Sequence, residues 1–127
     1  MTHFPTVRIL VVDDFADWRM RVREILAAHP EWKIISEASD GQDAVQQATE
    51  LQPDVVVLDI ALPRLNGIEA AKVIRQKSPS SRIVFLTHDN DRDIMGIALG
   101  VGQTTYVPKA RANTLLSGAV AASLREI

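Results

Sequence analysis

Five polar residues follow or end apolar segments of strand length, and their side chains form a coherent chemical set. Asp13 and Asp14 follow the first segment, Asp59 follows the third, Thr87 ends the fourth, and Lys109 lies just beyond the fifth. Mg²⁺ prefers oxygen ligands and takes few carboxylates from a protein, because it keeps several waters. An aspartate beside a divalent cation, an ammonium and a hydroxyl can accept a phosphoryl group as an acyl phosphate. The set therefore predicts phosphoryl chemistry supported by magnesium.

The elements that must position these residues are five strands alternating with five helices. Segments such as 55–58 are apolar without alternation, which is typical of strands covered on both faces of a parallel sheet. Strand-length runs and helical spacing alternate through residues 1–127 and predict one doubly wound α/β domain. We expect strands at 7–12, 33–38, 54–60, 83–87 and 105–107, with the fourth helix at 91–99 and the fifth at 112–125.

The first helix carries four further expectations. Asp14 occupies the position of an N-cap, with Asp17 three residues later, and His29 precedes a proline that ends the helix. Trp18 is expected to pack at the margin of this helix. Three arginines at alternate positions are interpreted as a solvated face: Arg19, Arg21 and Arg23.

The chemistry also favours one strand order. Ligands of open α/β sheets bind beyond the carboxyl ends of the strands, and neighbouring strands lie roughly 4.8 Å apart. In the order 3-2-1-4-5, Asp59 is too far from Asp13 and Asp14 to share an ion with them. In the order 2-1-3-4-5, the strands that carry these acids are neighbours, and Thr87 and Lys109 follow on the same side. We therefore expect a flavodoxin-like sheet with the order 2-1-3-4-5.

The composition excludes several classes of protein. The 127 residues are 46% hydrophobic and carry a net charge of −2, which argues against binding nucleic acid or anionic lipid through bulk charge. The absence of cysteine excludes disulfides, thiolate metal sites and a catalytic thiol. The sequence shows neither a secretory signal nor an apolar run approaching the ~20 residues that span a bilayer, so we expect a cytoplasmic domain without membrane contact.

Four groups of residues together resemble the response-regulator receiver domains of two-component signalling. They are Val11–Asp14, Leu58–Pro63 with Asn66–Gly67 following, Val84–Thr87 and Tyr106–Lys109. The match covers essentially the whole chain and has the CheY-like spacing. The last group is also similar to receivers attached to helix-turn-helix transcription factors of the NarL type.

This resemblance implies a role for each matching position. Asp59 is the expected phosphoacceptor, and Lys109 the residue that binds the phosphoryl group. Asp14 and Asp59 are expected to ligate Mg²⁺ together with the carbonyl oxygen of Ala61, while Asp13 acts mainly through water.

The expected switch consists of the Thr87 hydroxyl and the ring of Tyr106, which changes rotamer when Thr87 moves toward the phosphoryl group. Two positions depart from the family pattern. His88 stands where receivers usually have a small residue and is expected to narrow access to Asp59. Ala61 places no side chain over the acyl phosphate, so the two departures act on water access in opposite directions.

The expected partner is a sensor histidine kinase, with a homodimer as a further option. A receiver accepts one phosphoryl group and loses it slowly, so we do not expect a turnover enzyme. We expect regulation of transcription through an attached helix-turn-helix domain, so DNA would be contacted only by a segment absent from this chain. The alternatives are a stand-alone receiver and a dimerisation module that does not depend on phosphorylation.

Two other function classes fit the sequence poorly. An aspartyl-phosphate hydrolase needs a second carboxylate two residues after the nucleophile, where this chain has Ala61. A flavin- or nucleotide-binding module places a glycine- or hydroxyl-rich loop after the first strand, whereas Asp13 and Asp14 would repel a phosphate there.

Overall fold

The computed structural model of the chain describes residues 6–88 and 92–125. Within them, five parallel strands form a single sheet in the order β2-β1-β3-β4-β5, which confirms the predicted fold class. The strands are β1 (Val7–Val12), β2 (Trp32–Ala38), β3 (Val55–Leu58), β4 (Arg82–Thr87) and β5 (Thr104–Pro108). The helices are α1 (Ala16–Leu26), α2 (Gly41–Leu51), α3 (Gly67–Lys77), α4 (Arg92–Gly100) and α5 (Ala112–Arg125).

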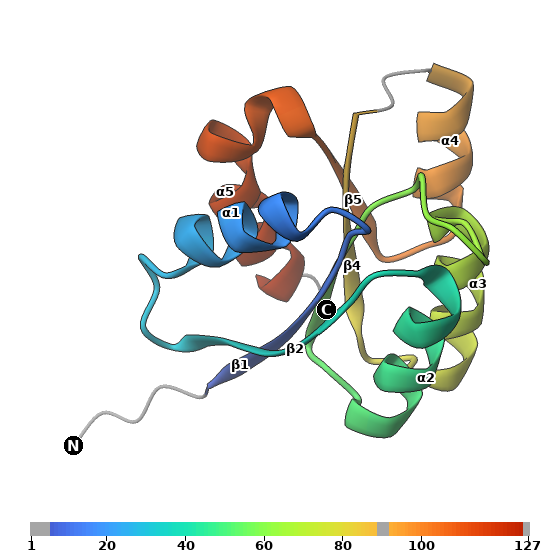
Figure 1. Cartoon of the computed structure of the whole chain (residues 1–127), viewed down its shortest axis with the longest axis horizontal. Helices are drawn as coiled ribbons and strands as arrows, with labels where there is room; N and C mark the ends of the chain where they lie inside the picture. The colour runs from blue at the N-terminus through green and yellow to red at the C-terminus, as the bar shows by residue number, and fades with distance from the viewer. Residues whose placement is uncertain (1–5, 89–91, 126–127) are drawn as a thin grey trace.

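The sheet is covered on both faces (Figure 1). Helices α1 and α5 pack on one face, where Leu26 and Leu116 belong to the same buried cluster as Val57 of β3. Helices α2, α3 and α4 pack on the other face, against the strand side chains that point away from α1 and α5. All four residues of β3 are buried, as expected for the unalternated run at the centre of a doubly wound sheet.

The first helix differs from the prediction at both ends. It begins at Ala16, and its N-cap is Phe15, which offers no side-chain hydrogen bond, so the prediction that Asp14 caps the helix was wrong. The neighbouring carboxylate binds the N-cap residue instead, because Oδ1 of Asp13 accepts a hydrogen bond from the Phe15 N–H at 3.0 Å. The helix ends at Leu26, before the predicted His29, whose ring stacks on Trp32 with centroids 3.8 Å apart.

The ends of the other elements shift by one or two residues. Strand β3 stops at Leu58, so Asp59 lies immediately beyond the strand, whereas the prediction continued to residue 60. A 3₁₀ turn over Lys109–Arg111 follows β5 and was not predicted. Asp91, the predicted start of the fourth helix, lies outside the described residues.

None of the helices within residues 6–88 and 92–125 combines the length and apolar character needed to cross a membrane.

Candidate functional site

The backbone of the sheet fixes two aspartates at its carboxyl edge. The N–H of Asp13, just after β1, donates to the Ala38 carbonyl of β2 at 3.1 Å. The N–H of Asp59, just after β3, donates to the Val12 carbonyl of β1 at 3.0 Å. The parallel hydrogen-bond ladder thus continues one residue past the strands and holds both aspartates side by side.

Asp13, Asp14 and Asp59 form one acidic cluster. Each offers a carboxylate oxygen, and these oxygens all lie within 4.8 Å of one another. Asp13 and Asp59 are 3% and 4% exposed, whereas Asp14 is exposed to solvent. The strand order brings together acids 45 residues or more apart in the sequence, as the argument from chemistry predicted.

Lys109 supplies the positive charge inside this cluster. Its Nζ lies 2.7 Å from Oδ2 of Asp13 and 3.0 Å from Oδ2 of Asp59, and its side chain is 1% exposed. Pairing of β4 with β5 sets Thr87 opposite Pro108, which places Lys109 at the same edge of the sheet. Burial of a lysine is tolerated here because the ammonium bridges two buried carboxylates.

Burial raises the pKa of the Asp13 carboxyl above its usual value. Hydrogen bonds from Lys109 and from the Phe15 N–H oppose this rise, while the charge of nearby Asp59 adds to it. The raised pKa indicates that the folded protein holds the ionised form of Asp13 at a cost. A cation that binds the carboxylates would remove that cost.

The donor set fits a hard divalent cation. When ionised, three carboxylates and one ammonium leave a net charge of −2 in the cluster, which one divalent ion neutralises. All the candidate side-chain donors are oxygen atoms, which suits Mg²⁺. The acidic cluster is therefore consistent with a magnesium site.

The loop after Asp59 is held close to the site by a glycine. A Cβ added at Gly67 would lie 2.0 Å from the carbonyl oxygen of Asp59, so only glycine permits the observed approach of α3. The N–H of Gly67 donates to the Ile60 carbonyl at 2.7 Å, and the N–H of Ala61 donates to Oδ1 of Asp59 at 3.4 Å. These contacts give the Asp59–Ala61 segment a defined path, while ligation by the Ala61 carbonyl stays a prediction.

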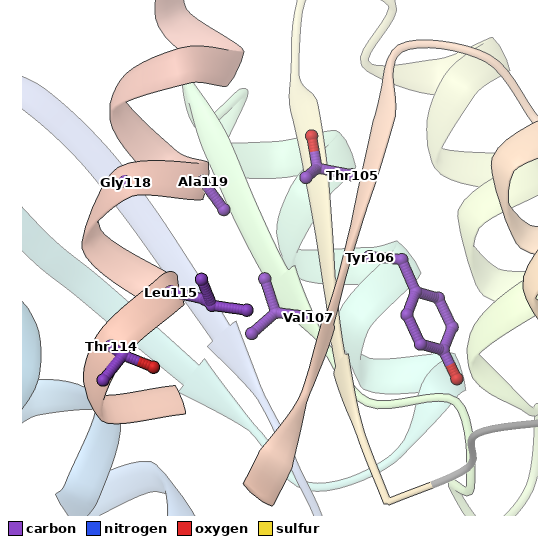
Figure 2. A pocket seen from close by; sticks show the side chains of 7 residues that line it. All are labelled: Thr105, Tyr106, Val107, Thr114, Leu115, Gly118 and Ala119. Carbon is purple, nitrogen blue, oxygen red and sulfur yellow. The ribbon is translucent and has the colours of Figure 1, made fainter. Parts of the chain in front are cut away.

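Thr87 and Tyr106 lie on neighbouring strands. Thr87 is 1% exposed at the end of β4, and Tyr106 pairs with Phe85 in the register of β4 and β5. Figure 2 shows the ring of Tyr106 on the side of β5 opposite α5, and the ring is partly buried against the cluster that includes Ala98 of α4. Val107 faces α5 instead, beside a groove of about 290 Å³ between β5 and α5. The switching roles of Thr87 and Tyr106 stay predictions.

The sequence interpretation missed three contacts of α1 with the site. Trp18 does not merely pack at a margin, because Nζ of Lys109 lies 4.9 Å from the centroid of its ring. His88, which is exposed, contacts Trp18 edge to face with centroids 5.7 Å apart. Arg19 is not simply solvated, because its Nη1 donates to the Asp13 carbonyl at 2.7 Å and its Nε pairs with Glu37 at 3.0 Å.

The signal that could have found these contacts is the position of the residues in the first turns of α1. Residues directly after a loop that carries ligands lie near those ligands, whichever face of the helix they occupy. Which of them point toward the site depends on the rotation of the helix, and the hydrophobic pattern fixes that rotation only coarsely.

Comparison with known proteins gives a consistent result. The family model described as response regulator receiver domain matches residues 9–121. The protein-glutamate methylesterase/protein-glutamine glutaminase of Thermotoga maritima is 38% identical over 112 residues, which are 87% of this chain and 33% of that protein. The protein of the same description from Idiomarina loihiensis is 42% identical over 106 residues, which are 82% of this chain and 27% of that protein. The chain thus spans a third or less of these two relatives.

Solved structures agree over nearly the full chain. The response regulator domain of Thermotoga maritima CheB has a TM-score of 0.83 at 33% identity and covers 96% of this chain and 99% of its own. A LuxR-family two-component response regulator from Aurantimonas has a TM-score of 0.88 at 34% identity, with 94% and 85% coverage. The receiver domain of the putative response regulator NarL from Mycobacterium tuberculosis has a TM-score of 0.90 at 25% identity, with 98% and 100% coverage.

Proposed function

Because the chain belongs to the response-regulator receiver family, we propose that Asp59 accepts a phosphoryl group from a sensor histidine kinase in a Mg²⁺-dependent reaction. The observation that carries the proposal is the cluster of three carboxylates within 4.8 Å, two of them bridged by the buried ammonium of Lys109. Asp13, Asp14, Asp59 and the Ala61 carbonyl are the proposed ligands of the cation.

In the proposed reaction, a carboxylate oxygen of Asp59 attacks the phosphorus of a phosphohistidine. The P–N bond breaks, and its electron pair stays with the imidazole nitrogen, which takes up a proton. Mg²⁺ supplies charge that offsets the repulsion between the carboxylate and the phosphoryl oxygens. Lys109 exchanges its ion pair with Asp59 for one with a phosphoryl oxygen, and the Thr87 hydroxyl donates to another.

The output follows from the same exchange of partners. In our proposal Thr87 moves toward the phosphoryl group and the ring of Tyr106 turns further inward. The surface of α4, β5 and α5 is thereby shifted between two states, a local charge event with a remote effect. His88, beside Thr87, limits access of water and phosphodonor to Asp59.

The test uses acetyl phosphate and Mg²⁺ with the purified chain. We expect one phosphoryl group on the wild type, none on Asp59→Ala, and none in the presence of excess EDTA. Reduction of the acyl phosphate with borohydride and peptide mapping then locate the modified residue. Glu50→Gln, an exposed acid on α2, is the matched control and should be modified like the wild type. Modification elsewhere, or none, would refute the proposal.

The same experiment separates a receiver from a hydrolase. A receiver takes up one equivalent and loses it slowly, so after the phosphodonor is removed we expect slow release of no more than one phosphate per chain. Rapid release of many equivalents per chain while the phosphodonor is present would identify a turnover enzyme.

For the output we propose a longer regulator in which residues 1–127 form the receiver domain and a helix-turn-helix domain binds DNA in the cytoplasm. The 34% identity with a LuxR-family regulator supports this assignment. The methylesterase names of the curated relatives support a different attached domain, one that acts on modified glutamate side chains. The coding sequence beyond residue 127 discriminates between these outputs, and size-exclusion chromatography with and without phosphodonor tests for a homodimer.

A further inference from the structure

An aromatic ring of α1 lies against the ammonium of Lys109, which also pairs with two carboxylates. The Trp18 ring of α1 lies with its centroid 4.9 Å from Nζ of Lys109, while Asp13 and Asp59 lie 2.7 and 3.0 Å from the same atom. Trp18 is partly buried against the core cluster beneath α1 and α5. The ammonium therefore lies among two anions and one π face.

This contact is attractive and differs in kind from the two ion pairs. The face of an indole carries the negative part of its quadrupole, and its attraction for a cation increases when the cation is desolvated. The side chain of Lys109 is 1% exposed, so this condition is met. The ring carries no formal charge, so it does not compete with a phosphoryl oxygen for the ammonium.

We propose that Trp18 is a positioning residue for Lys109, holding the ammonium in place while its partner changes from the Asp59 carboxylate to the phosphoryl group. This inference rests on the proposed function and names a residue that the family resemblance did not supply. A lysine side chain has four flexible carbons, so during the exchange the remaining ion pair with Asp13 would by itself leave the ammonium free to move around that carboxylate. A fixed π face restricts those positions throughout the reaction.

The ring of Trp18 is itself held in place from the side of β4. His88 meets it edge to face, with an interplanar angle of 83° and centroids 5.7 Å apart. On α1, the guanidinium of Arg21 lies 5.5 Å from the same ring centroid. Trp18 thus connects Lys109 to the residue that directly follows Thr87, which gives His88 a function beyond narrowing access.

The kinetic test compares Trp18→Leu with Trp18→Phe. Leucine keeps an apolar side chain but removes the π face, whereas phenylalanine keeps a smaller one. We expect Trp18→Leu to be phosphorylated by acetyl phosphate roughly tenfold more slowly than the wild type, a change equivalent to about 1.4 kcal/mol. Trp18→Phe should recover part of the rate. Equal rates for the wild type and the leucine variant, with both folded, would overturn the proposal.

A second test needs no phosphorylation. The chain has two tryptophans, so a Trp32→Phe background leaves Trp18 as the only indole. In that background Lys109→Met should shift the emission of Trp18, and so should Mg²⁺ with beryllium fluoride, which mimics the phosphoryl group. Unchanged emission on both treatments would contradict the assignment.

A double-mutant cycle gives the corresponding energetic readout. Trp18→Leu and Lys109→Met should show a non-zero coupling free energy in urea unfolding, because each removes the same contact. Additive effects would refute the contact. Failure of the proposed function has a different signature, because Asp59 would then stay unmodified in the wild type while emission and coupling still reported the contact.

Discussion

Replacing Gly67 by alanine tests how closely α3 must approach the phosphoacceptor loop. The added Cβ would lie 2.0 Å from the carbonyl oxygen of Asp59 and 2.6 Å from Cα of Ile60, whereas ordinary van der Waals contact begins at 3.4 Å. Both neighbours are backbone atoms, so no side chain can rotate away. One of the two segments must move by more than about 1 Å in a close-packed interior.

The expected cost is at least about 3 kcal/mol, at the upper end of the range for overpacked cores, because the clash is with backbone. That is a large share of the roughly 5–15 kcal/mol by which domains of this size are stable. We also expect weaker Mg²⁺ binding, because the displaced carbonyl belongs to Asp59. Urea unfolding with and without Mg²⁺ measures both effects.

Gly118→Ala in α5 is the matched control, because nothing lies within 4 Å of its added Cβ. It should stabilise the chain by about 0.5–1 kcal/mol through the higher helix propensity of alanine. If the free energy of unfolding of Gly67→Ala lies within about 0.5 kcal/mol of the wild-type value, the inferred close approach of α3 to Asp59 is wrong.

Three further predictions concern the acidic cluster. With metal chelated, Asp13→Asn should unfold at higher urea concentration than the wild type at neutral pH. Because the pKa of the Asp13 carboxyl is raised in the folded protein, the protonated carboxyl contributes fully to stability below the usual pKa of 3.8, and this contribution is lost as the pH rises through the pKa of the folded state. The stability advantage of Asp13→Asn over the wild type should therefore vanish in acid. An advantage that is unchanged in acid would contradict this cause. Asp14→Asn should leave the metal-free Tm unchanged, because Asp14 is exposed, but should reduce the rise in Tm caused by Mg²⁺; an undiminished rise would exclude it as a ligand. Arg19→Ala should cost about 1 kcal/mol in urea unfolding and weaken Mg²⁺ binding in titrations, because it releases the Asp13 carbonyl and Glu37. Arg19→Lys should not restore Mg²⁺ affinity, because one ammonium replaces the fork that reaches both partners; full recovery would show that charge alone suffices.

The pattern of residues along the chain was enough to predict the alternation of strands and helices and the edge of the sheet where the polar residues meet. Asp13, Asp59 and Lys109 could be placed together because parallel strands deliver their carboxyl ends to one edge. This inference needs only the period of the hydrophobic pattern and the position of each polar residue at the end of its strand. Neither depends on how side chains pack.

Which residues of α1 reach the site could be known only from the folded chain. Trp18 and Arg19 are neighbours in the sequence, yet one covers Lys109 and the other holds the Asp13 carbonyl. The start of the helix at Ala16 also depends on a loop in which Asp13 bonds the Phe15 N–H. Rotation and docking of a helix follow from packing over the whole face of the sheet, and a few residues of local sequence carry too little information to fix them.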